Sequence, residues 1–317
     1  MVSKKISIAG DEGWDYLSVD NVNQNLFVSH GSVVNVVDLK TDKTIATIVD
    51  TKGVHGIAIA NDLNKAFISC GKDNSVSVIN LKTFELLEKV KIEGQKPDAI
   101  LYDQFSHYVL TYNAKTNDAT VIDANTNKVV KTIPLGGKPE FSVTNTKGLI
   151  YVNIEDKNEI KTIDTKTLEV VATWSIAPGD EPSGLALDLQ NNILFSVCSN
   201  KMMVIVDAKT GKIIQTVPIG DGCDGVAFDA KNKMIFSSNG EGTITAVKEQ
   251  STKKFSVAQT ITTQKGARTI TINPTTGQLY TPTAAFGVRP EPTTENPKPR
   301  ASLWPDSFTV LVVETSK

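Results

Sequence analysis

Seven residues stand at nearly equal intervals along the chain, and all but one of them are ionisable: Asp15, His55, Asp98, Glu140, Ser183, Asp224 and Arg268. Carboxylates and imidazole bind divalent metal ions and polar cations, whereas a guanidinium binds anionic groups. If the fold brings these residues together, they form the densest polar constellation that the chain offers.

Two interpretations of this set remain open. In the first, a cation or small polar ligand binds at a site formed by Asp15, His55, Asp98, Glu140, Asp224 and Arg268, with Arg268 anchoring an anionic group. In the second, the carboxylates accept hydrogen bonds from turn N–H groups, and no ligand is needed. Arg268 then pairs with Asp15 and Asp224 of the two units that flank it.

A divalent metal is the one cofactor that these residue types suggest. The candidate ligands are His30, His55, Asp98, Glu140 and Asp224. Imidazole together with carboxylates can hold zinc or copper. The candidates come from separate segments, however, and none of them shows the local spacing of a known metal motif. A solvated or singly hydrogen-bonded state is the alternative for each histidine.

The elements that must position these residues are short apolar runs separated by Asn, Asp and Gly. Four such runs occupy 181–220, namely Leu185–Leu187, Ile193–Val197, Met203–Val206 and Ile213–Ile219. An Asp or Asn closes the third run of five successive units, at gaps of 42, 43, 41 and 43 residues: Asp38, Asn80, Asp123, Asp164 and Asp207. A period near 40 residues with four strands in each unit is typical of a β-propeller blade.

A four-residue segment that contains one of the seven residues named above precedes the first run of each unit, as in Gly13–Tyr16 and Gly53–Gly56. This marker occurs seven times, which predicts an all-β fold. We expect residues 1–317 to form a single domain, a seven-bladed β-propeller of four-stranded antiparallel blades. Blade seven lacks its fourth strand at the C-terminal end. The segment Lys5–Gly10 resembles the fourth runs Lys131–Gly136 and Gln215–Gly220, so an N-terminal strand is expected to complete this blade and close the ring.

A Pro-rich segment, residues 284–306, is inserted between the second and third strands of blade seven. Connections of this length are often functional or disordered. In a propeller, the seven residues named at the outset are expected to form a polar ring at one mouth of the central channel. The insertion should emerge on the same face. There it is a candidate lid through Phe286, Arg289, Arg300 and Trp304. The alternative is a polyproline loop packed on the rim.

Composition excludes several classes of partner. The net charge of −2 gives no general attraction to nucleic acid. No apolar run approaches the roughly 18 residues of a transmembrane helix, and the first ten residues lack the apolar core of a signal peptide. Because the chain begins within a few residues of its closing strand, we expect a mature, exported form in the periplasm or at the cell surface, with a cytoplasmic location as the alternative. We also expect a monomer.

Three cysteines, Cys70, Cys198 and Cys223, are too few for a disulfide framework. Free cysteines are usually buried and inert, and that is the first interpretation here. Cys198 and Cys223 fall on one face of neighbouring blades. In an exported protein a disulfide between them is the alternative.

The chain also resembles a known family. The strands Tyr151-Val-Asn153 and Tyr108-Val-Leu-Thr111, followed by the Asp-closed run and a Thr-x-Lys-type turn, are similar to the YVTN-repeat seven-bladed β-propellers of YncE-like bacterial proteins. The resemblance covers essentially the whole chain and extends to the Pro-rich insertion. It implies the propeller fold, and it implies export because many such relatives are exported. It implies no particular chemistry, since its motifs are strand and turn residues.

Two functions follow from these observations. The first is a non-catalytic binding or scaffold propeller that holds a protein or a small polar ligand at the mouth of the central channel. The alternative is a lactonase- or lyase-like hydrolytic enzyme, in which His55, Asp98, Glu140 and Asp224 converge on a divalent metal. No nucleophile, zinc-protease or phosphate-binding motif occurs in the sequence.

Overall fold

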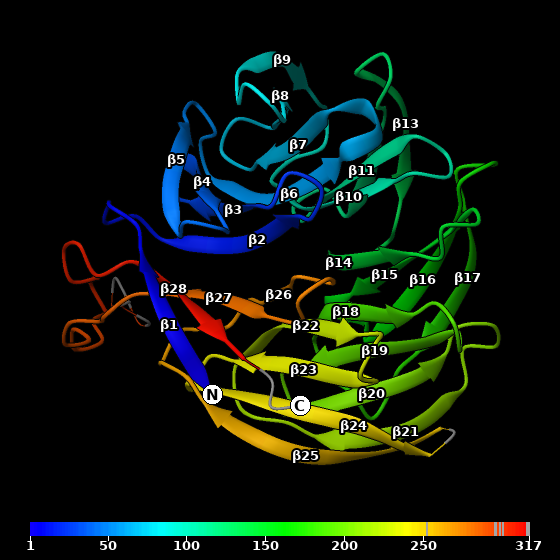
Figure 1. The fold of residues 1–317 in the computed structure, drawn as a ribbon. Helices are drawn as coiled ribbons and strands as arrows, with labels where there is room; N and C mark the ends of the chain where they lie inside the picture. Colours follow the sequence, from blue (N-terminus) through cyan, green and yellow to red (C-terminus); the bar gives the residue numbers. More distant parts are fainter. Residues whose placement is uncertain (252, 295–296, 298, 300, 315–317) are drawn as a thin grey trace.

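The computed structural model describes residues 1–251, 253–294, 297, 299 and 301–314. Within these residues the chain forms seven four-stranded antiparallel sheets arranged as blades around a central channel (Figure 1). The predicted seven-bladed β-propeller is therefore confirmed. Two short 3₁₀ turns, η1 (Asn61–Leu63) and η2 (Glu155–Lys157), interrupt the strand order.

Blades one to six each consist of four consecutive strands, ordered from the channel outwards. Blade one has β2 (Trp14–Asp20), β3 (Asn25–His30), β4 (Val33–Asp38) and β5 (Lys43–Ile48). Blade two has β6 (Val54–Ala60), β7 (Lys65–Cys70), β8 (Ser75–Asn80) and β9 (Leu86–Lys91). Blade three has β10 (Pro97–Asp103), β11 (Tyr108–Asn113), β12 (Asp118–Asp123) and β13 (Lys128–Pro134).

The next three blades follow the same order. Blade four has β14 (Pro139–Thr144), β15 (Leu149–Ile154), β16 (Glu159–Asp164) and β17 (Glu169–Ser175). Blade five has β18 (Pro182–Asp188), β19 (Ile193–Cys198), β20 (Met202–Asp207) and β21 (Ile213–Pro218). Blade six has β22 (Cys223–Asp229), β23 (Met234–Asn239), β24 (Thr243–Ser251) and β25 (Lys254–Thr262).

Blade seven is assembled from both ends of the chain. Its strands are β26 (Thr271–Ile272), β27 (Leu279–Thr283) and β28 (Thr309–Val313), and β1 (Val2–Ser7) pairs with β28 as the outermost strand. Ile6 lies opposite Val310, and both side chains are buried. The predicted closure is confirmed, although β1 begins and ends three residues earlier than the expected segment 5–10.

The core lies between blades rather than inside them. Phe27 and Val34 of blade one, for example, pack in one cluster with Ile57, Ile68 and Ile79 of blade two. A flat four-stranded sheet has two apolar faces and cannot bury them alone, so each blade depends on its neighbours. This mutual dependence fixes the orientation of every inner strand towards the channel.

In blades one to five, the Asp or Asn that closes the third strand caps the turn that follows. In blade one, Asp38 Oδ1 accepts hydrogen bonds from the N–H groups of Lys40 (2.8 Å) and Thr41 (2.7 Å). The same pair of bonds recurs at Asn80, Asp123, Asp164 and Asp207. The regular spacing of these residues in the sequence therefore reflects a repeated turn, in which the side chain binds N–H groups two and three positions ahead.

The described part of the insertion folds back on itself beside β1 and β28 (Figure 1). Gly287 N–H donates to Ser302 O (2.8 Å), Trp304 N–H donates to Ala285 O (2.9 Å), and Phe286 forms a β-bridge with Leu303. The base of the insertion is thus a short antiparallel ladder.

Candidate functional site

The ring of polar residues arises because six of them share one position in their blades. Each is the second residue of an innermost strand: Asp15 in β2, His55 in β6, Asp98 in β10, Glu140 in β14, Ser183 in β18 and Asp224 in β22. In all six strands the pairing with the second strand is irregular at this point. An irregularity of this kind re-aims a side chain, which suits a position at the channel mouth.

Asp15, His55 and Asp98 form the tightest group. His55 Nδ1 lies 2.6 Å from Asp15 Oδ2 and 3.3 Å from Asp98 Oδ1. One potential ligand atom from each residue lies within 4.8 Å of the others, as expected for residues that could hold a metal ion. Burial disfavours the charged imidazole, but the hydrogen bond to Asp15 and the two carboxylate charges prevail and raise the pKa of His55. The imidazole Nδ1 therefore lies between two carboxylates, which favour its protonated form.

Arg268 precedes the short strand β26 and pairs with carboxylates of the two flanking blades. Its Nε donates to Asp224 Oδ2 (2.9 Å), and its Nη2 donates to Asp15 Oδ1 (3.3 Å) and to Trp14 O (3.4 Å). This is the pairing expected under the second interpretation of the sequence. Arg268 is therefore already engaged, and its charge offsets acidic side chains of the ring.

The environment of the remaining carboxyl groups disfavours their charged form. Burial and the charge of Asp98 raise the pKa of Glu140 to about 8, although Lys138 Nζ lies 2.7 Å from Glu140 Oε1. Burial raises the pKa of Asp224 to about 7 against the opposing effect of Arg268. Burial likewise raises the pKa of Asp98. Lys138 Nζ also pairs with Glu155, so one ammonium group is shared between two carboxylates.

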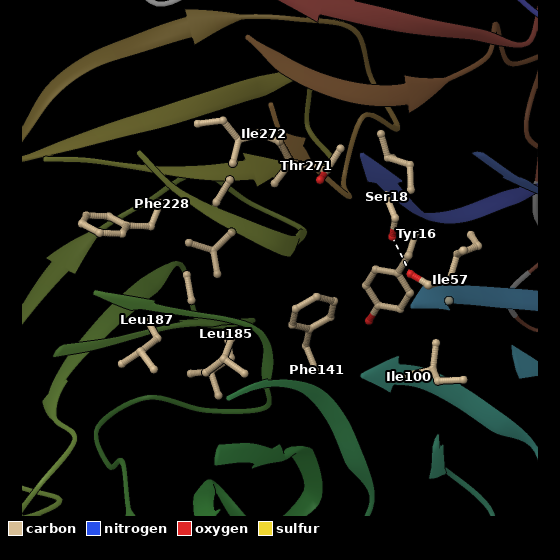
Figure 2. A pocket seen from close by; sticks show the side chains of 17 residues that line it. Tyr16, Ser18, Ile57, Ile100, Phe141, Leu185, Leu187, Phe228, Thr271 and Ile272 are labelled. Atoms are coloured by element: carbon tan, nitrogen blue, oxygen red, sulfur yellow. Dashed lines mark hydrogen bonds between the residues drawn. The ribbon is translucent and has the colours of Figure 1, made fainter. Parts of the chain in front are cut away.

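Tyr16 and Phe141 project into the channel next to this ring. Their ring centroids are 5.2 Å apart, and the two residues come from inner strands of blades one and four (Figure 2). Burial, followed by the charges of four ring carboxylates, raises the pKa of the Tyr16 hydroxyl, which forms no hydrogen bond with any residue that the structure describes. Both side chains line a cavity of about 310 Å³ whose other lining residues are mostly apolar, including Ile100 and Leu185, although polar atoms make up half of its surface.

His30 and the cysteines lie apart from the tight group. His30 is buried, with Nδ1 3.1 Å from Asn35 Oδ1 and its ring stacked on Phe308 at a centroid distance of 4.1 Å. Among the described residues, the group that could hold a metal contains neither His30 nor Glu140 nor Asp224.

All three cysteines are free and buried, so the alternative of a Cys198–Cys223 disulfide is not realised. The Cys223 thiol instead donates to Cys198 O at 3.0 Å. Burial raises the pKa of both thiols to about 12, which keeps them protonated and unreactive at neutral pH. Cys70 is buried as well, and burial also raises its pKa.

The candidate lid residues have different surroundings. Phe286 and Arg289 line a pocket of about 500 Å³ that also includes Arg268, so this part of the insertion borders the ring. Trp304 is 61% exposed and does not line that pocket. Arg300 lies outside the described residues.

Sequence reasoning missed Tyr16 and Phe141, although each directly follows a ring residue in the chain. It also missed Trp14 and Lys265, which line the pocket beside the insertion. A signal for the aromatic residues is present in the sequence, because Trp14, Tyr16 and Phe141 are bulky residues of the markers that precede the first strands.

Comparisons with known proteins support the fold. No family model matches the chain. A curated protein, "Antigen Lp49" of Leptospira interrogans, is 23% identical over 242 residues, which is 69% of this chain and 51% of that protein. The chain thus spans about half the length of this relative.

Two solved structures share the architecture at low sequence identity. A chain of hydrazine synthase from Kuenenia stuttgartiensis has a TM-score of 0.76 at 16% identity, covering 86% of this chain and 94% of that one. A chain of a mitotic checkpoint complex has a TM-score of 0.77 at 13% identity, covering 96% of this chain and 91% of that one. At such identities the likeness shows the propeller fold alone. Among the described residues, no helix is long and apolar enough to span a membrane.

Proposed function

We propose that the protein is a non-catalytic binding propeller that takes a small cation, either a divalent metal ion or an organic ammonium group, at the channel mouth. The observation that carries this proposal is the Asp15–His55–Asp98 group, in which two carboxylates share one imidazole nitrogen at 2.6 and 3.3 Å. A cation bound near these atoms supplies the positive charge that a proton on His55 Nδ1 would otherwise supply. Its charge also opposes the burial and the carboxylate repulsion that raise the pKa of the neighbouring carboxylates.

The arrangement favours binding over catalysis. The enzymatic alternative requires His55, Asp98, Glu140 and Asp224 on one metal ion. The tight group contains only His55 and Asp98 of these four, whereas Asp224 is paired with Arg268 and Glu140 with Lys138. A carboxylate that is tied to a guanidinium or an ammonium group is poorly placed to act as a metal ligand or a general base.

We further propose that the protein belongs to the YVTN-repeat propellers and acts outside the cytoplasm. The Tyr-Val-Asn-type second strands and the weak similarity to a leptospiral antigen support this view. Fractionation of cells that express the native gene tests it. A protein found wholly in the cytosolic fraction would contradict the proposed location.

Cation binding is tested by isothermal titration calorimetry of metal-stripped protein. The titrants are calcium, manganese, zinc and the organic ammonium compound spermidine. Asp98→Asn should weaken the tightest of these interactions at least about tenfold, because it removes one of two facing carboxylates. Asp221→Asn is the matched control, since Asp221 is an exposed carboxylate outside the group. Absence of binding by all four titrants, or equal losses in the two variants, would refute the proposal.

A further inference from the structure

A second pocket lies between the insertion and the propeller, beside the acidic ring. It has a volume of about 500 Å³, within the range of ligand sites in proteins. Trp14 of β2 and Phe286 of the insertion form one wall, with ring centroids 6.0 Å apart, and Leu303 of the insertion adds apolar surface. The two rings are inclined by 56°, and together with Leu303 they give the pocket an apolar side that can contact the flat body of an organic molecule.

The charge around this pocket has the opposite sign to that of the ring. Lys265, Arg268 and Arg289 line it, and none of its described lining residues is acidic. Arg268 is occupied by Asp224 and Asp15. Arg289 uses its Nε to donate to Pro299 O (2.8 Å), and within the described residues neither Arg289 nor Lys265 forms an ion pair. Two cationic side chains thus remain for an anionic group.

The walls are held in place by close packing. A Cβ atom on Gly266 would stand 2.6 Å from the Phe286 ring, so the aromatic ring rests directly on the backbone there. Trp14 also stacks on Phe308, at a centroid distance of 5.5 Å. The base of the insertion is tied to the start of the chain, because Asp306 N–H donates to Asp11 Oδ1 (2.7 Å). Because the aromatic walls are already fixed, little binding free energy is lost in ordering their side chains when a ligand binds.

We infer that this pocket binds a small organic anion with a flat apolar body, of the aromatic carboxylate class. The apolar body lies against Trp14 and Phe286, and the carboxylate lies near Arg289 and Lys265. A guanidinium receives a carboxylate through two parallel hydrogen bonds, which gives Arg289 the larger part in recognition. This site is separate from the proposed cation site and does not depend on it.

The test uses naphthoate as the probe and naphthamide, its neutral counterpart of the same shape, in isothermal titration calorimetry on the full chain. We expect naphthoate to bind and naphthamide to bind at least about tenfold more weakly. Arg289→Gln and Lys265→Gln should each weaken naphthoate by about tenfold and leave naphthamide unchanged. Arg289→Lys keeps the charge and should lose less than Arg289→Gln.

Two controls make the outcome decisive. Lys254→Gln removes an exposed lysine of β25 and should leave naphthoate affinity as it is. Asp221→Asn should also leave it unchanged, because Asp221 is an exposed carboxylate that does not line this pocket. The inference is overturned if naphthoate does not bind at millimolar concentration or if naphthamide binds equally well. It is equally overturned if neither Arg289→Gln nor Lys265→Gln alters the affinity for naphthoate.

Discussion

Tyr16 and Phe141 meet inside the channel from blades one and four, with their rings 5.2 Å apart and inclined by 49°. Both side chains line the cavity next to the ring of carboxylates. Blades one and four are not neighbours in the ring, so this pair joins sheets that share no blade interface. Burial, followed by the charges of the ring carboxylates, raises the pKa of the Tyr16 hydroxyl.

Removing only the Tyr16 hydroxyl should not destabilise the protein. The hydroxyl is part of a buried side chain and forms no hydrogen bond with the described residues. Tyr16→Phe is therefore expected to change the free energy of unfolding by less than about 1 kcal/mol, whereas Tyr16→Ala should cost about 3 kcal/mol through the cavity it leaves. Urea unfolding followed by tryptophan fluorescence measures both. A loss of about 2 kcal/mol in Tyr16→Phe would mean that the hydroxyl is bound in solution.

The stability of the ligand-free protein should fall as the pH rises from about 5 to 8. The pKa of Glu140 is raised to about 8 and that of Asp224 to about 7, so the folded state holds protons that the unfolded chain has lost. The free energy of unfolding then decreases with pH above the ordinary carboxyl range. His55 acts in the same direction: its pKa is raised, so its contribution is lost as the pH rises through the folded value.

Glu140→Gln tests this dependence. The variant should show a flatter decline of the free energy of unfolding between pH 5 and 8, measured by urea unfolding at several pH values. Glu181→Gln is the control, since Glu181 is exposed at the start of the next blade. Two results would contradict the proposal that the folded state holds extra protons. One is a free energy of unfolding that rises with pH across this range in the parent, and the other is a decline in Glu140→Gln as steep as in the parent.

The blades and the ring could be predicted from the sequence because both depend on position within a repeat. Asp123 and Asp207 occupy equivalent positions in their blades because each caps the turn after the third strand. Asp15 and Asp224 are equivalent because each is the second residue of an innermost strand. The pairing of Arg268 was only one of two interpretations. Spacing along the chain does not show whether a guanidinium meets a carboxylate or remains free for a ligand.

Contacts that break the repeat could not be predicted. Tyr16 and Phe141 come from blades that are distant in the ring, so no local pattern links them. The pocket beside Arg289 depends on the path of a Pro-rich segment that has no strand period. The sequence predicts β1 three residues too late because alternating apolar residues occur only at Ile6 and Ile8, and an edge strand has only one neighbour to fix its limits.

Closure of the ring should be sensitive to a single buried residue of β1. Ile6 is 2% exposed and packs with Val310 and Val312. Ile6→Ala is expected to lower the free energy of unfolding by about 2–4 kcal/mol, whereas Lys5→Ala, at the exposed neighbouring position, should change it by less than about 0.5 kcal/mol. Denaturant unfolding of the two variants compares them directly. Equal, small effects would show that β1 does not hold blade seven closed in solution.

Arg268 and Asp224 should be energetically coupled. Arg268 Nε and Asp224 Oδ2 are 2.9 Å apart, and the Asp224 side chain is 27% exposed. Arg268→Gln leaves Asp224 and Asp15 without their cation, so it should lower the free energy of unfolding by about 2–3 kcal/mol. Asp224→Asn should cost less, since it removes a carboxylate whose pKa is already raised.

The double variant should be more stable than the sum of the single losses predicts, by about 1–2 kcal/mol. A double-mutant cycle by urea unfolding at pH 8, where Asp224 is ionised, measures this coupling. Strict additivity would mean that Arg268 serves Asp15 alone and that the Asp224 contact contributes nothing to folding.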